Sequence, residues 1–162
     1  MALSFKLVLK MRKLPNDEAI HFKQDGQRFL QPNTVKLSSN ANYRLTLVLR
    51  PRQDIQSVLI NGERYDCKCV PNEKKDDEFS GTYTVDYSTQ GVPKTKPGKR
   101  KEIYMLLEME KGVNFKTVLQ CKIYAENETD HCRWGQVLNF VDYECRLSEG
   151  QAAVDITREK FL

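Results

Sequence analysis

His131 and Cys132 are adjacent, and a histidine beside a thiol has the residue types of a nucleophile activated by a general base. In proteins that use this chemistry the two side chains meet across the fold, because sequence neighbours rarely direct the imidazole at the adjacent sulfur. The stretch from Asp130 to Cys132 therefore favours a turn in which the cysteine packs and the histidine makes local hydrogen bonds. His21 adjoins Phe22 in a predicted strand and is interpreted as a rim residue. The sequence shows no phosphate-binding glycine loop and no nucleophile elbow, so we predict no enzyme.

Cys67 and Cys69 fall on one face of a predicted strand, where two thiolates could begin a zinc site. The other zinc-type ligands considered are Cys121, Cys132, Cys145 and His131. Structural zinc sites usually combine two closely spaced pairs of ligands, and the sequence offers no second pair. The cysteines are therefore predicted to pack as small hydrophobic side chains, with no metal and no cofactor. Their odd number, five, indicates reduced thiols in the cytosol.

Positive charge is concentrated between Lys94 and Lys101, where five lysines and arginines fall within eight residues around Pro97-Gly98. Such a run suits phosphates, an anionic membrane surface or a nuclear import receptor. No aromatic residue is interleaved, so base stacking is not supported and no nucleic-acid partner is predicted. The alternative is a solvated, mobile loop between two strands. The stretch from Asn72 to Glu78 is interpreted as another charged loop.

Apolar and polar residues alternate through much of the chain, which predicts β-strands with one buried face. Asn61-Gly62 and Asp25-Gly26 have the composition of two-residue hairpin turns, whereas Gln151 to Leu162 has only a weak pattern. No segment shows a sustained helical period of apolar residues with caps. Strands are expected at Leu3 to Met11, Thr34 to Leu37, Tyr43 to Leu49, Ile55 to Ile60, Glu63 to Val70, Thr82 to Tyr87, Ile103 to Met109, Phe115 to Ala125 and Asn139 to Leu147.

Nine or ten short strands joined by Gly, Pro and Asn turns predict an all-β fold, an antiparallel β-sandwich or barrel. The 162 residues fit a single domain, 1–162, that buries roughly 70% of its unfolded surface. Trp134, the only tryptophan, is expected to anchor the packing at one end of the core. Lys6 and Lys10 interrupt the first apolar stretch, which is unlike a signal peptide, so a cytoplasmic location is expected.

The apolar faces of two packed sheets would enclose either their own side chains or a pocket for an acyl or prenyl chain. If a ligand or peptide enters, it contacts the inward residues of the best-patterned strands and the tryptophan. These candidate binding residues are Phe5, Leu7, Leu45, Leu47, Tyr83, Met105, Leu107, Leu119, Cys121, Trp134 and Tyr143.

Several short blocks, in order along nearly the whole chain, resemble the cannabinoid receptor-interacting protein family. They are Pro15-Asn16-Asp17, Asp25-Gly26-Gln27-Arg28-Phe29, Thr34-Val35-Lys36-Leu37, Gly81-Thr82-Tyr83, Asp130-His131-Cys132-Arg133-Trp134-Gly135, Tyr143-Glu144-Cys145 and Phe161-Leu162. The resemblance implies an immunoglobulin-like β-sandwich similar to the prenyl-binding domain of the Rho GDP-dissociation inhibitor. It also implies a cytoplasmic, non-enzymatic protein that binds the C-terminal tail of the type-1 cannabinoid receptor and restrains its constitutive signalling.

Two partners therefore remain open at this point. The first is the cytoplasmic tail of a membrane receptor, which would add to a sheet edge or enter the mouth of the sandwich. The second is a lipidated protein whose prenyl or acyl group is shielded between the sheets. Peripheral contact with a membrane through the Lys94–Lys101 loop is compatible with either partner.

Overall fold

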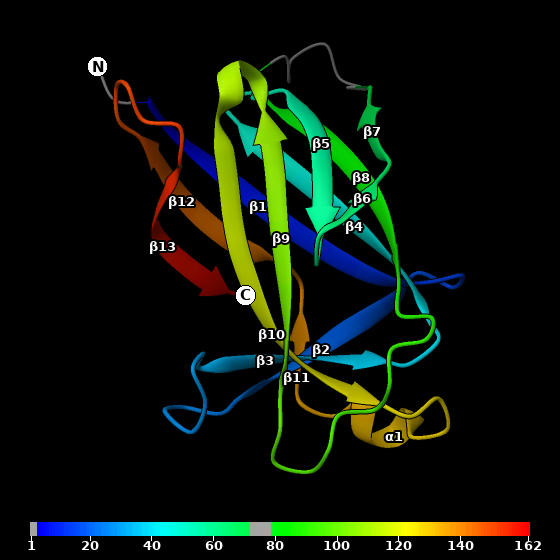
Figure 1. The fold of residues 1–162 in the computed structure, drawn as a ribbon. Helices are drawn as coiled ribbons and strands as arrows, with labels where there is room; N and C mark the ends of the chain where they lie inside the picture. The colour runs from blue at the N-terminus through cyan, green and yellow to red at the C-terminus, as the bar shows by residue number, and fades with distance from the viewer. Residues whose placement is uncertain (1–2, 72–78) are drawn as a thin grey trace.

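The chain folds into two layers of β-structure that pack face to face, as the alternation predicts (Figure 1). The computed structural model describes residues 3–71 and 79–162, and within them it contains thirteen strands. The all-β prediction is confirmed. The charged loop expected at Asn72 to Glu78 lies outside the described residues.

The first layer is antiparallel throughout and holds both the first strand and the last. β1 lies at its centre, between β4 on one side and β12 on the other. In spatial order the layer consists of β13 (Asp155–Phe161), β12 (Val141–Leu147), β1 (Leu3–Leu14), β4 (Asn42–Arg50), β8 (Gly81–Ser88) and β7 (Cys67–Val70).

The second layer contains one parallel pair, so the expectation of purely antiparallel sheets is wrong there. β3 and β10 run in the same direction, with Val35 paired to Cys121. Alternation of apolar and polar residues indicates that one face of a strand is exposed to solvent, but it does not indicate the direction of the strand. The long chain between β3 and β10 supplies the crossover connection that parallel neighbours need. In spatial order the layer consists of β6 (Glu63–Tyr65), β5 (Ile55–Ile60), β9 (Lys101–Met109), β10 (Asn114–Tyr124), β3 (Asn33–Ser38), β2 (Glu18–Gln24) and β11 (Gln136–Leu138).

The two layers are joined where β1 turns into β2. Only two residue pairs connect these strands, Arg12 with Ala19 and Lys13 with Glu18. Beyond this junction β3, β2 and β11 continue the second layer from β10 to one end of the molecule, where the short helix α1 (Thr129–Cys132) also lies (Figure 1). This end carries the pocket described below.

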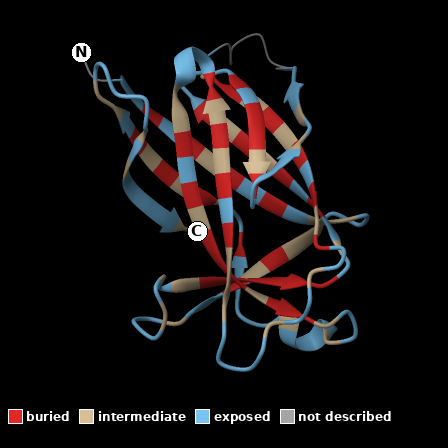
Figure 2. Ribbon diagram, viewed as in Figure 1, coloured by how far each residue is buried: buried red, intermediate tan, exposed pale blue. Residues whose placement is uncertain are grey.

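Buried positions alternate with exposed ones along the strands of both layers (Figure 2), and the buried apolar side chains form one cluster between the layers. Leu7, Leu47 and Leu107 are completely buried, and each contributes about 1.5–3 kcal/mol relative to an exposed position. The rings of Phe115 and Tyr143 meet edge to face across the layers, with centroids 5.4 Å apart. The core is therefore built by the period-two pattern of the strands.

Trp134 does not anchor the core, because 73% of its side chain is exposed. Phe115, Tyr43 and Tyr143 supply the large buried rings instead. The turn expected just before the tryptophan is one turn of α-helix, α1, with no buried residue. An exposed four-residue helix leaves no apolar period in the sequence, which is why the pattern did not reveal it.

The last twelve residues were expected to be a tail, and the structure corrects this. β13 pairs with β12 from Val141↔Phe161 to Arg146↔Asp155, and the Leu162 amide donates to the Phe140 carbonyl at 2.9 Å. Most β13 side chains are exposed. Only Ile156 and Phe161 pack against the core, with the Phe161 ring 5.5 Å from the Phe22 ring, so the sequence of this edge strand has only a weak pattern.

One of the two predicted hairpins forms and the other does not. Asn61 and Gly62 join β5 to β6 with φ of 50° and 82°, as a two-residue primed turn requires. Asp25-Gly26 instead opens a longer loop, because β2 ends at Gln24 and β3 begins at Asn33. The Asp25 side chain is 1% exposed and binds Arg100 at 3.1 Å, so it is used inside the fold and not in a turn.

Candidate functional site

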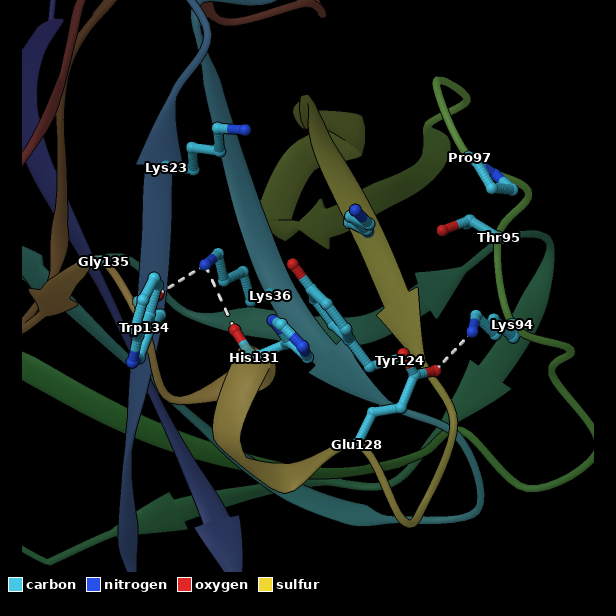
Figure 3. Close-up of a pocket in the computed structure, with 11 residues that line it drawn as sticks. Lys23, Lys36, Lys94, Thr95, Pro97, Tyr124, Glu128, His131, Trp134 and Gly135 are labelled. Carbon is cyan, nitrogen blue, oxygen red and sulfur yellow. Dashed lines mark hydrogen bonds and ion pairs between the residues drawn. The ribbon is translucent and has the colours of Figure 1, made fainter.

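A pocket of about 540 Å³ opens at the end of the molecule that carries α1 (Figure 3). Its floor is the outer face of β2, β3 and β10, and its walls are α1 and the segment 94–97. This volume is typical of small-ligand sites, which range over roughly 300–1,000 Å³. The lining residues are Lys23, Lys36, Lys94, Thr95, Pro97, Lys122, Tyr124, Glu128, His131, Trp134 and Gly135.

Three lysines on three neighbouring strands give the pocket its charge. Lys36 on β3 is paired in register with Lys122 on β10, and Lys23 on β2 lies opposite Thr34 of β3. Residues paired in register project from the same face, so these ammonium groups converge. Val35 and Leu37 of β3 face the core and are fully buried. The alternation of this short strand therefore points Lys36 away from the core and toward the pocket.

Lys36 holds the segment after α1 in place. Its ammonium donates to the Trp134 carbonyl at 2.6 Å and to the His131 carbonyl at 3.2 Å, which leaves one N–H donor unassigned. Burial, followed by the positive charges of Lys23 and Lys122, lowers the pKa of Lys36. Lys36 therefore both fixes the segment after α1 through hydrogen bonds and contributes to a positively charged surface.

Gly135 is required where the chain passes β2. Its φ is +110°, and a Cβ at this position would lie 2.7 Å from the Phe22 carbonyl oxygen. Only glycine tolerates both the conformation and the contact. The close approach fixes Trp134 at the rim of the pocket, beside the His131 ring at a centroid distance of 6.4 Å.

The basic run is partly fixed to the fold, in contrast to the solvated loop considered above. The Thr95 amide donates to the Ile123 carbonyl at 3.0 Å, and Lys94 binds Glu128 at 2.6 Å. Arg100 is buried against Asp25. Lys96 and Lys99 are exposed. The run therefore forms one wall of the pocket and leaves some of its lysines free to face a partner.

The thiols and histidines do not form a nucleophile and base in the geometry observed. The Ser38 hydroxyl lies 3.5 Å from the Cys132 sulfur, while the His131 ring lies against Trp134. Burial raises the pKa of Cys121 and Cys145 to about 12, which keeps both thiols protonated. Among residues 3–71 and 79–162, no three His, Cys, Asp or Glu side chains gather as a metal site would need.

A second hollow, of about 420 Å³, lies where the two layers diverge beside β13. β10 pairs with β3 only from Cys121 onward, and its start forms a single bridge between Asn114 and Ala153. Across the described residues, no strand pairs with the intervening edge of β10 on that side. We call this hollow the β10–β13 groove. Its lining residues are Gln31, Tyr104, Met105, Leu106, Lys116, Thr117, Val118, Ile156 and Glu159.

The residues predicted to bind a ligand fall into two groups. Ten of them lie between the layers and are at most 5% exposed: Phe5, Leu7, Leu45, Leu47, Tyr83, Met105, Leu107, Leu119, Cys121 and Tyr143. Of these only Met105 borders the β10–β13 groove, and Trp134 borders the lysine pocket. Sequence reasoning missed Lys23, Lys36 and Lys122. Their outward positions follow from alternation, but their convergence depends on the parallel β3–β10 pair.

The fold, together with the pocket beside α1 and the β10–β13 groove, defines an all-β protein suited to binding a partner. None of the helices within the described residues is long and apolar enough to cross a membrane. Residues 1–161 match the family described as CB1 cannabinoid receptor-interacting protein 1. The human and mouse proteins of that name are each 34% identical to this chain over 161 residues, 97% of this chain and 95% of theirs. The bovine protein is 33% identical over the same shares. The chain belongs to this family, which confirms the resemblance inferred from the sequence.

Proposed function

We propose that this protein is a non-enzymatic cytoplasmic adaptor that binds the C-terminal tail of a receptor of the type-1 cannabinoid class and modulates its constitutive signalling. Membership of a family named for receptor interaction supports this proposal. All five cysteines, each within the described residues, are free thiols, as suits a reducing compartment.

The observation that carries a binding mode is the unpaired edge of β10 in the β10–β13 groove. An extended peptide would donate and accept backbone hydrogen bonds along this edge as an added strand. Val118 and Ile156 give the groove half-buried apolar walls, and Lys116 at its rim suits an acidic residue of the peptide. The tail is therefore held by its backbone and selected by a few side chains.

The test is a fluorescence-anisotropy titration of the protein into labelled tail peptide, with Val118→Arg as the groove variant. A bulky charge in the groove should weaken binding at least about tenfold, since it removes an apolar contact and fills the space the peptide needs. Val48→Arg is the matched control, because Val48 is a half-exposed valine on the outer face of β4, in the other layer. Equal effects of the two substitutions would contradict the binding mode.

The groove also supports a second function, a carrier for a lipidated protein. Met105 belongs to both the core and the groove, so an acyl or prenyl chain that displaces its side chain would extend from the groove into the space between the layers. The same titration separates the two functions when each peptide is tested plain and prenylated. Saturable binding of the plain tail supports the adaptor, and binding that requires the lipid supports the carrier.

We also propose that the Lys94–Lys101 segment lies against the anionic inner surface of the membrane. Its exposed lysines, Lys96 and Lys99, support this location because each basic residue near such a surface contributes about 1 kcal/mol of attraction. An adaptor for a receptor tail works within a short distance of that surface.

A further inference from the structure

The lysine pocket concentrates positive charge that the fold does not neutralise. Four lysines line it, against one carboxylate, Glu128, which is already paired with Lys94. The nearby carboxylate of Asp25 is buried against Arg100 and lies 3.9 Å from Lys23. Within the described residues neither Lys36 nor Lys122 has a carboxylate within 4.0 Å. Both ammonium groups lie over the Tyr124 ring instead, Lys36 at 5.9 Å and Lys122 at 5.1 Å from its centre, and neither forms an ion pair there with a described residue.

This arrangement opposes stability. Like charges that face each other on neighbouring strands repel, and burial adds to the cost for Lys36, which is 8% exposed. The pKa of Lys122 is lowered by burial and by the charges of Arg100 and Lys23. Lys36 gains two backbone hydrogen bonds in return, but nothing comparable among the described residues offsets the charge of Lys122 beside it. Local features that cost stability without structural gain are typical of binding sites. The missing partner is an anion with more than one negative charge.

We propose that the pocket formed by Lys23, Lys36 and Lys122 binds the multiply phosphorylated headgroup of an anionic membrane lipid. Lysine is a common point-charge ligand for phosphate, and three ammonium groups converging on one cavity fit several phosphates on a small ring. An acidic peptide would suit charges spread along a groove, whereas this cluster is compact and enclosed by α1 and the segment 94–97.

The rim of the pocket favours a lipid source over a free phosphate ester. Trp134 borders the pocket and is exposed, although a tryptophan ring is costly to leave in water (Figure 3). Tryptophan prefers the interface of a membrane, where its ring meets the acyl boundary and its N–H stays hydrated. Lys96 and Lys99 extend the positive surface beside it. This inference rests on the proposed contact between the Lys94–Lys101 segment and the membrane, and it specifies the lipid that the neighbouring pocket binds.

The experiment is co-sedimentation of the full chain with phosphatidylcholine vesicles that carry a minor fraction of phosphatidylinositol bisphosphate. Vesicles with phosphatidylserine at matched charge are the lipid control, and soluble inositol trisphosphate, measured by calorimetry, tests the pocket without a membrane. We expect saturable binding to the bisphosphate vesicles, weaker binding to phosphatidylserine, and measurable binding of the soluble headgroup.

Lys122→Glu should reduce binding of both the vesicles and the soluble headgroup at least about tenfold, since it removes one charge-assisted contact and places a negative charge beside the phosphates. Lys10→Glu is the matched control, because Lys10 is exposed on β1 away from the pocket and its reversal changes net charge equally. Trp134→Ala should weaken vesicle binding and leave the soluble headgroup unaffected, which separates the lipid source from the phosphate chemistry.

Three results would overturn the proposal. Equal losses for Lys122→Glu and Lys10→Glu would show general attraction to negative charge and no pocket. Binding of the soluble headgroup without any vesicle binding would assign the pocket to a free phosphate ester. Binding of an acidic peptide that Lys122→Glu abolishes, with no binding of the headgroup, would assign it to a protein partner. If Lys122→Glu remains folded and still binds the receptor-tail peptide, loss of headgroup binding is a separate result from failure of the proposed adaptor function.

Discussion

At the residue scale, Asp25 shows how one side chain can determine both a loop and its response to pH. Its carboxylate accepts a hydrogen bond from Thr34 and two from Arg100, whose guanidinium lies 4.2 Å from the centre of the Phe29 ring. Burial opposes ionisation of Asp25, but the Thr34 hydrogen bond and the Arg100 charge outweigh it and lower its pKa. The ion pair therefore ties the loop after β2 to the basic segment.

Asp25→Asn should lower the free energy of unfolding at neutral pH by about 3 kcal/mol, because Arg100 would remain buried without its counter-charge. The folded pKa lies below the ordinary value of 3.8, so the carboxylate's contribution is full above about pH 4 and is lost as pH falls through the folded pKa. Urea titrations from pH 7 to about 3 should thus show a steeper acid loss for the native chain than for the variant.

A matched control for this measurement is Asp17→Asn, since Asp17 pairs with Arg12 at the surface and its side chain is 73% exposed. An exposed pair of this kind contributes at most about 1 kcal/mol. If the two substitutions cost the same at pH 7, the Asp25–Arg100 pair does not stabilise the loop.

At the scale of elements, the segment from α1 to β11 is positioned by backbone geometry. Gly135→Ala should destabilise the chain by about 1–3 kcal/mol, because alanine strains the positive φ and its Cβ meets the Phe22 carbonyl. The fluorescence of Trp134 should shift as well, since the displaced segment loses the Lys36 hydrogen bonds. Thermal unfolding with intrinsic fluorescence measures both effects.

Gly150→Ala provides the comparison for this element. Gly150 has a φ of +79° and no atom within 4 Å of an added Cβ, so alanine there costs only the strain of the conformation, about 1 kcal/mol. Unfolding that is no more sensitive at Gly135 than at Gly150 would mean that the close approach to β2 is not what fixes the segment.

Elements differ in how well the sequence predicts them, for a physical reason. Strands with one buried face, such as β1 and β4, follow from alternation. β13 was missed because most of its side chains are exposed, and only Ile156 and Phe161 pack against the core, which is too few to produce an alternation. Trp134 was misplaced because a large ring is buried only where its segment faces the core, and this segment lies at the rim of the pocket, where Lys36 holds the Trp134 carbonyl. The lysine pocket forms only because β3 pairs with β10, and the alternation of side chains in the sequence does not predict which strands pair.

At the scale of the whole molecule, β10 connects the two hollows. Val118 in the β10–β13 groove and Lys122 in the lysine pocket both project from its outer face, about 13 Å apart along the strand at 3.3 Å per residue. Sites at this separation with no shared partner are expected to act independently. The tail peptide and the phosphorylated headgroup should therefore bind together, each with the affinity it shows alone.

When the tail peptide and the phosphorylated lipid are carried by the same vesicle, the apparent affinity of the protein for that vesicle should rise without any new contact. When the tail is anchored to vesicles that carry the phosphorylated lipid, the second binding event becomes intramolecular, and we expect a gain of about a hundredfold over the tail in solution. Lys122→Glu should remove this gain and leave solution binding of the tail intact, while Val118→Arg should leave only lipid binding. Surface plasmon resonance on such vesicles measures all three cases, and an undiminished gain in Lys122→Glu would refute a two-site arrangement along β10.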